Sequence, residues 1–150
     1  MATTTPSGID LIGTFGRLVE AYNRLERELG RSLEGLCGIP HSWYEVFLRI
    51  SRAEGGRVSM GALADQVALT TGGITRMLDR MVAAGYVERV PCPTDRRVQY
   101  ATLTPAGRAK LKEATAINTR DLESAFTGFT AKDLASLDEL LDRLRDRPAR

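Results

Sequence analysis

The first part of the chain carries a regular stripe of apolar residues. They recur at alternating steps of four and three positions: Leu11, Phe15, Leu18, Tyr22, Leu25 and Leu29. Steps of this size bring side chains to one face of an α-helix. The pattern predicts a long amphipathic helix over residues 9–33, which Gly35, Gly38 and Pro40 then interrupt. A stripe this regular can pack inside one subunit or against another chain.

The centre of the chain alternates short helical and extended patterns. Apolar spacing and capping residues predict three helices: from His41 to the Gly55-Gly56 pair, over residues 60–69 with Ser59 as N-cap, and over residues 70–84 with Thr70 as N-cap. Alternating residues then predict strands over 86–90 and 98–103. Two short helices joined by a tight turn form a helix-turn-helix pattern, and the predicted hairpin follows it.

The C-terminal part reads as two more helices. Thr104-Pro105 is a cap followed by a first-turn proline, and the helix that it begins extends to about Phe126. Thr130 begins the last helix, whose apolar stripe consists of Leu134, Leu137, Leu141 and Leu144. The predicted fold is mainly α with a small β-hairpin wing, in a single domain over residues 1–150.

Composition narrows the class of protein. Two cysteines in 150 residues are too few for a disulfide framework and suit a reducing compartment. No apolar run reaches the roughly 20 residues of a membrane span, and the N-terminus lacks a signal-peptide pattern, so we expect a cytoplasmic location. His41 is the only histidine, which argues against a metal or catalytic cluster. The sequence shows no nucleophile–base pair or phosphate loop, so we expect no cofactor and no enzymatic activity.

Charge is distributed unevenly along the chain. The formal net charge is only +2, but residues 70–97 contain five arginines and three acids, whereas residues 120–146 contain four basic residues and seven acids. A molecule polarised in this way can present one face to phosphates and keep the other away. The basic segment is therefore a candidate surface for nucleic acid.

The helix predicted over 70–84 has the composition of a DNA-reading helix. Small hydroxyl and glycine residues on its first turns allow close approach of the backbone to a phosphate. Arginines four residues apart share one face and can reach base edges or phosphates. The candidate contacts on this helix are Thr70, Thr71, Gly73, Thr75, Arg76 and Arg80. The alternative is an ordinary surface helix with a polar N-terminus.

The predicted hairpin carries the second basic element. Arg96 and Arg97 lie at its tip, where an arginine can enter a minor groove and gain from the negative potential there. Asp95 is interpreted as a supporting carboxylate that orients an arginine or a loop N–H. A solvated charged turn is the alternative.

The segments SMGALADQVALTTGGITRMLDRMVAAGYVER and PTDRRVQYATLTPAGRAKL resemble the MarR family of bacterial transcriptional regulators. The most specific element is the pattern DRR-x5-LT-x2-G, and the resemblance covers roughly residues 9–146. It implies a homodimer with dimerisation helices over 9–33 and 105–146 and a DNA-binding lobe over 41–104. Residues 70–84 would enter the major groove and residues 91–98 the minor groove.

Individual residues follow from the same resemblance. Thr70, Gly73, Thr75 and Arg76 match recognition-helix contact positions, and Arg97 matches the wing arginine. Gly73 departs from the hydroxyl residue that the family often has there, which weakens the case for a base contact. The implied function is that of a sequence-specific regulator, a repressor on a pseudo-palindromic operator, released by a small aromatic or anionic effector. A winged-helix protein–protein adaptor is the rival hypothesis.

The aromatic residues near His41 and the two cysteines each allow two interpretations. His41, Trp43 and Tyr44 form a candidate effector pocket, although a tryptophan early in an apolar helix also suits the core. Cys37 in a glycine-flanked loop and Cys92 between two prolines are either redox-sensing thiols or inert ones.

Overall fold

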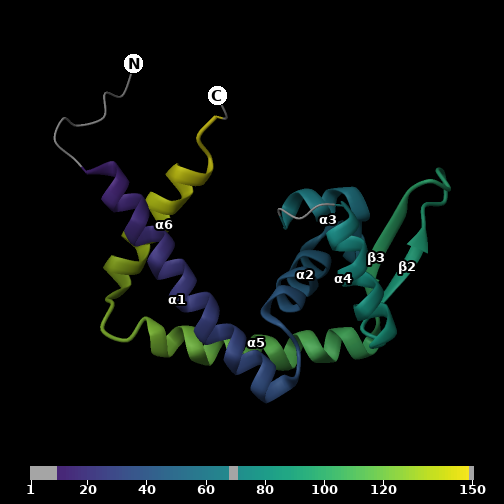
Figure 1. Ribbon diagram of the computed structural model, residues 1–150, viewed down its shortest axis with the longest axis horizontal. Helices are drawn as coiled ribbons and strands as arrows, with labels where there is room; N and C mark the ends of the chain where they lie inside the picture. The colour runs from purple at the N-terminus through teal and green to yellow at the C-terminus, as the bar shows by residue number, and fades with distance from the viewer. Residues whose placement is uncertain (1–9, 68–70, 149–150) are drawn as a thin grey trace.

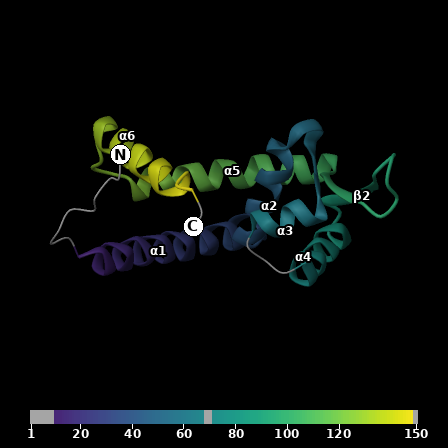
Figure 2. The same cartoon turned by 90° about the horizontal axis from the view of Figure 1, so that it is seen from above.

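The computed structural model describes residues 10–67 and 71–148. Two long helices, α1 (Leu11–Cys37) and α5 (Pro105–Ala125), cross beneath a lobe formed by the middle of the chain (Figure 1). The lobe contains α2 (His41–Arg52), α3 (Met60–Gln66), α4 (Thr71–Ala83) and a small sheet. The last helix, α6 (Ala131–Arg145), lies at the opposite end of the molecule from the hairpin of β2 (Val87–Pro91) and β3 (Gln99–Leu103) (Figure 2).

Helix α1 is longer than the sequence pattern predicts. Asp10 caps its N-terminus by accepting a hydrogen bond from the Gly13 N–H at 2.8 Å. The helix continues through Gly35 and ends at Gly38, whose φ of 72° places it in the left-handed region. The predicted break at Gly35 is therefore wrong. Leu33 and Cys37 are both buried, and packing of this last turn outweighs the roughly 1 kcal/mol that a mid-helix glycine costs.

The sheet has three strands rather than the two of the predicted hairpin. Strand β2 (Val87–Pro91) pairs antiparallel with β3 (Gln99–Leu103), and β1 (Arg57–Ser59) pairs with the other edge of β3. Helix α2 begins at His41 as predicted but ends at Arg52, because Glu54–Gly56 forms a separate 3₁₀ turn leading into β1. The third strand ties the start of α3 to the root of the wing.

The core lies where α2, α3, α4 and the sheet meet. Ser59 caps α3 by accepting a hydrogen bond from Ala62 N–H at 3.2 Å, as predicted, although this helix ends at Gln66. The predicted cap Thr70 lies outside the described residues. The largest fully buried side chains include Leu33, Ile39, Phe47, Ile50, Leu63, Ile74, Leu78 and Met81. Met77, which helical spacing places beside Ile74 and Met81, is only partly covered.

A tight junction joins the lobe to α5. Thr104, the predicted N-cap, accepts the Gly107 N–H at 3.0 Å and donates its hydroxyl to the Gly85 carbonyl at 2.6 Å. Its backbone N–H also donates to the carbonyl of Tyr86. A Cβ at Gly107 would overlap the Tyr86 carbonyl oxygen, so only glycine fits at this position. These contacts give a physical reason for the spacing of Leu103, Thr104 and Gly107.

Two helical faces remain without partners in the single chain. On α1 the stripe is exposed in its first half, where Phe15 is 66% and Tyr22 56% exposed, and it becomes buried only at Leu29. Helix α6 buries none of its residues, and Leu141 and Leu144 on it are 40% and 48% exposed. Within the described residues, no helix is long and apolar enough to cross a membrane.

Candidate nucleic-acid interface

Helix α4 has one buried face and one basic face. Ile74, Leu78 and Met81 are 0% exposed and hold the helix against the core. Arg76 and Arg80 project from the exposed side, and both line a shallow depression with Gly73 and Asp79. The Arg76 Nε donates to the Gly72 carbonyl at 3.4 Å. The free side of α4 therefore offers two guanidinium groups to an anionic partner.

The remaining predicted contacts on α4 differ in their placement. Gly73 and Thr75 are partly buried in the first turns, at the edge between the two faces. Thr71 begins the helix, but its side chain lies outside the described part of the chain, as does the whole of Thr70. Gly72 is exposed, and a Cβ there would meet open space, so the backbone at this position can approach a partner closely.

The wing presents Arg96 and Arg97 on a loop that Asp95 organises. The Asp95 Oδ1 accepts the Arg97 backbone N–H at 3.0 Å and the Arg97 Nε at 3.3 Å, so it makes both kinds of contact that its sequence position suggested. Its carbonyl also accepts the Val98 N–H. The Arg97 side chain remains 91% exposed, which leaves most of its donors available.

The ionisation of Asp95 maintains this loop. The hydrogen bonds from the Arg97 backbone N–H and then its side chain hold the pKa of Asp95 below its ordinary value. A carboxyl whose pKa is lowered in the folded state contributes stability above its unfolded pKa and loses it as the pH falls through the folded pKa. The loop contact is therefore complete at neutral pH and is lost only on acidification.

A cross-brace between α4 and the wing is the feature that sequence reasoning missed. The Arg89 Nη2 on β2 donates to the Asp79 Oδ1 on α4 at 2.7 Å. Arg89 pairs with Ala101 in the sheet register, which turns its side chain toward the covered face where α4 lies. The two residues are ten positions apart on different elements, so only their opposite charges could have indicated this ion pair in the sequence. The brace neutralises the acid on the basic face of α4.

We expect this brace to contribute little to stability, because the Asp79 side chain is 55% exposed and that of Arg89 33%. A double-mutant cycle with Asp79→Asn and Arg89→Gln, followed by urea unfolding, should give a coupling of about 0.2–1 kcal/mol. The exposed i,i+4 pair Arg24–Glu28 is a matched control, with about 0.3–0.5 kcal/mol expected. A coupling above about 2 kcal/mol would contradict this solvent-screened description.

The candidate effector residues point to different surroundings. Trp43 is partly buried and packs edge-on against Tyr86, with ring centroids 6.4 Å apart. Tyr44 is buried, with its ring centroid 6.0 Å from that of His41. His41 itself lines a depression with residues of α1, among them Glu26 and Arg27. The structure therefore places Trp43 and Tyr44 against the core, and His41 at the surface between α1 and α2.

The two cysteines have opposite environments. Burial raises the pKa of the Cys37 thiol, which disfavours the reactive thiolate. A hydrogen bond with the Thr94 hydroxyl, 3.3 Å from the sulfur, lowers the pKa of the partly exposed Cys92. In the part of the chain that the structure describes, no group of three His, Cys, Asp or Glu side chains is placed to hold a metal ion.

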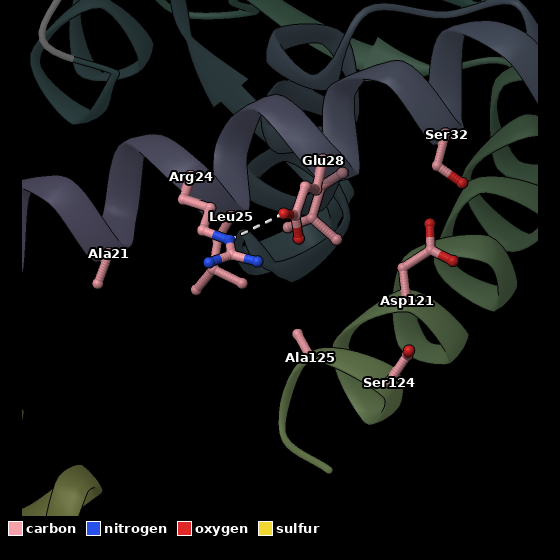
Figure 3. Close-up of a pocket in the computed structure, with 9 residues that line it drawn as sticks. Ala21, Arg24, Leu25, Glu28, Ser32, Asp121, Ser124 and Ala125 are labelled. Carbon is pink, nitrogen blue, oxygen red and sulfur yellow. Dashed lines mark hydrogen bonds and ion pairs between the residues drawn. The ribbon is translucent and has the colours of Figure 1, made fainter.

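A groove of about 720 Å³ separates α1 from the end of α5 (Figure 3). Arg24, Glu28 and Ser32 line one wall, and Asp121 and Ser124 line the other. A hydrogen bond with Ser32, followed by one from Arg120, lowers the pKa of Asp121. Ala21, Leu25 and Ala125 also line it, so the groove between the two long helices has a mixed polar and apolar lining, and it lies away from α4 (Figure 1).

Comparison with known proteins places this arrangement in a family. A family model described as MarR family matches residues 38–98. The multiple antibiotic resistance protein MarR of Salmonella typhimurium is 30% identical over 130 residues, which cover 86% of this chain and 89% of that protein. The Streptomyces coelicolor regulator Sco3205, solved in complex with DNA, superposes with a TM-score of 0.83 at 25% identity. The match covers 98% of this chain and 94% of the Sco3205 chain.

A mutant of MarR from Escherichia coli, complexed with operator DNA, superposes with a TM-score of 0.76 at 29% identity. The match covers 91% of this chain and 99% of the MarR chain. The likeness therefore spans the long helices as well as the lobe and its wing. From the shared sequence over most of both chains and the superposition of the fold, we conclude that this chain belongs to the MarR family of transcriptional regulators, which are not enzymes.

Proposed function

We propose that the protein binds double-stranded DNA as a homodimer and represses transcription from a pseudo-palindromic operator. The observation that carries the proposal is the pairing of two basic elements in one lobe, the Arg76–Arg80 face of α4 and the Arg96–Arg97 wing, braced to each other through Asp79 and Arg89. Helix α4 would read base edges in the major groove, and the wing would enter the adjacent minor groove. The DNA complexes of Sco3205 and MarR support this use of the fold.

The uncovered apolar faces support the dimer. The chain exposes 10973 Å², whereas a compact monomer of its mass would expose about 7,500 Å². The excess is on the scale of an obligate interface. We assign it to the first half of α1, the α1–α5 groove and the leucine face of α6, which would pack against their equivalents in a second copy. A two-fold dimer would then hold its recognition helices one DNA turn apart, roughly 34 Å.

Release by a small-molecule effector completes the proposed mechanism. An effector that binds better to one spacing of the two α4 helices than to the other would shift the dimer away from the operator. The grooves beside α1 that contain His41 and Ser32 are candidate effector sites. An effector bound there would alter the position of each lobe relative to the long helices. A regulator of this kind works where the DNA is, which agrees with the expected cytoplasmic location.

The decisive experiment is a salt titration of DNA affinity with and without the wing arginine. Phosphate contacts release counterions, so log Kd should depend steeply on log salt in the native protein. Arg97→Ala should weaken binding to all sequences by about 10-fold or more and reduce the salt slope by about two, because the dimer loses one phosphate contact in each subunit. A flat salt response in the native protein would contradict DNA binding and favour the adaptor hypothesis.

Arg76→Ala is the comparison variant for that experiment. Its position on α4 predicts a loss of about 1–3 kcal/mol together with relaxed base preference, which selection of bound sequences from a random DNA pool would reveal. Equal base preference in the native and Arg76→Ala proteins would remove Arg76 from the reading face. The same selection would give the operator and its half-site spacing.

A further inference from the structure

One partly buried lysine connects the recognition helix to the dimerisation helices. The Lys110 ammonium on α5 donates to the Cys37 carbonyl at 3.1 Å, at the last turn of α1, and to the Glu113 Oε2 at 2.8 Å. It also lies 5.9 Å from the centroid of the Tyr86 ring, within cation–π range. Two of the three N–H donors of the ammonium therefore have hydrogen-bond acceptors, and the charge as a whole faces the Tyr86 ring. The Lys110 side chain is only 18% exposed.

The partner Tyr86 is attached to α4 by its backbone. Gly85 ends the helix with a φ of 79°, and the Tyr86 N–H then donates to the Met81 carbonyl at 3.0 Å, so Tyr86 belongs to the C-terminal cap of α4. Its ring packs edge-on against Trp43 and Phe47 of α2. A movement of α4 therefore moves Tyr86 with it.

The positive charge of Lys110 lies beside the C-terminal end of α1 and is stabilised by Glu113. α1 has no basic residue in its own last turn, so Lys110 supplies the cation that the carbonyl end of this helix favours. The hydrogen bond to Glu113 raises the pKa of Lys110, and the ammonium stays protonated at neutral pH. One cation thus contacts the end of α1, the first turns of α5 and the cap of α4 at the same time.

We propose that Lys110 is a positioning residue that sets the distance of the recognition helix from the dimerisation helices, and through it the half-site spacing that the dimer accepts. This inference rests on the proposed function. With the three contacts in place, the lobe sits rigidly on α1 and α5. Without them, the lobe is held to α1 and α5 by the Thr104–Gly107 junction and by the apolar packing of Leu33 and Ala114, which carries no directional contact to the cap of α4.

The test measures affinity for operators in which the spacer between half-sites is lengthened or shortened by one base pair. Each base pair moves a half-site by about 3.4 Å and rotates it by about 35°, so the native dimer should lose about 10-fold or more per step. Lys110→Met should bind the best spacer about 10-fold more weakly but discriminate between spacers by less than about 3-fold. Discrimination is a ratio within one variant, so a reduced folded fraction cancels from it.

Three further variants complete the design. Lys110→Arg keeps the charge and should restore most of the discrimination. Lys112→Met, at an exposed lysine on the same helix, should behave as the native protein. Tyr86→Leu removes the aromatic partner of the same cation–π contact. This variant should lose discrimination between spacers as Lys110→Met does.

The two hypotheses fail in different ways. If the native protein binds DNA with a sharp spacing preference and Lys110→Met keeps that preference, the proposed role of Lys110 is wrong. The proposed function would stand in that case. Native protein without salt-sensitive DNA binding would overturn the proposed function itself, and this inference with it.

Discussion

Replacing Gly107 with alanine should destabilise the protein more than any other single methyl addition in the lobe–α5 junction. The new Cβ would overlap the Tyr86 carbonyl oxygen, a backbone atom that also accepts the Thr104 N–H. Since backbone cannot rotate away as a side chain can, either α5 or the turn after α4 must shift. We expect a loss of about 3 kcal/mol, which for a chain of this size lowers Tm by roughly 6–12 °C.

Thermal unfolding at matched protein concentration checks this prediction, and Gly35→Ala is its control. Gly35 lies inside α1, where an added Cβ would meet open space. Alanine there should raise stability by about 0.5–1 kcal/mol, because glycine in a helix interior loses more conformational entropy on folding. If Gly107→Ala unfolded at the native temperature, the close approach of α5 to Tyr86 would be wrong.

Placing a charge on the leucine face of α6 should separate the proposed dimer. Leu141 is 40% exposed in the single chain and lies on the face that we assign to the partner. Leu141→Glu would bury an unpaired carboxylate, and two-fold symmetry introduces it twice. Sedimentation should show monomers, and operator affinity should fall by about 100-fold or more as the advantage of two linked half-sites disappears.

Lys132→Glu is the matched control for this experiment. Lys132 is exposed on the opposite side of α6, so the variant introduces a glutamate without entering the leucine face. It should remain dimeric. A stable Leu141→Glu dimer would mean that the interface lies elsewhere, and the α1–α5 groove would then be the next surface to test.

Features that depend on local chemistry were predictable from sequence. The starts of α2 at His41 and of α5 after Thr104, and the Ser59 cap of α3, all agree with the structure. A cap works through hydrogen bonds that span three residues, so the necessary information is adjacent in the chain. The buried face of α4 was predictable for the same reason, since helical periodicity alone places Ile74, Leu78 and Met81 together.

Features that depend on contacts between distant segments were not predictable in this way. The pairing of β1 with β3 joins residues about 45 positions apart, and a three-residue strand has too little pattern of its own to indicate a partner. The continuation of α1 past Gly35 depends on where Leu33 and Cys37 are buried. The brace between Asp79 and Arg89 requires knowledge of how the sheet faces α4.

By itself, the sequence determined the order of the helices and of the hairpin, most of their capping residues, the two leucine-rich faces and the basic character of residues 70–97, because each is a property of neighbouring residues along the chain. Only the tertiary structure decided which of those faces lack a partner, why Gly107 must be glycine, and how Lys110 joins α1, α5 and Tyr86. The physical reason is that burial, close approach and the geometry of a shared ammonium are set by segments that meet only after folding.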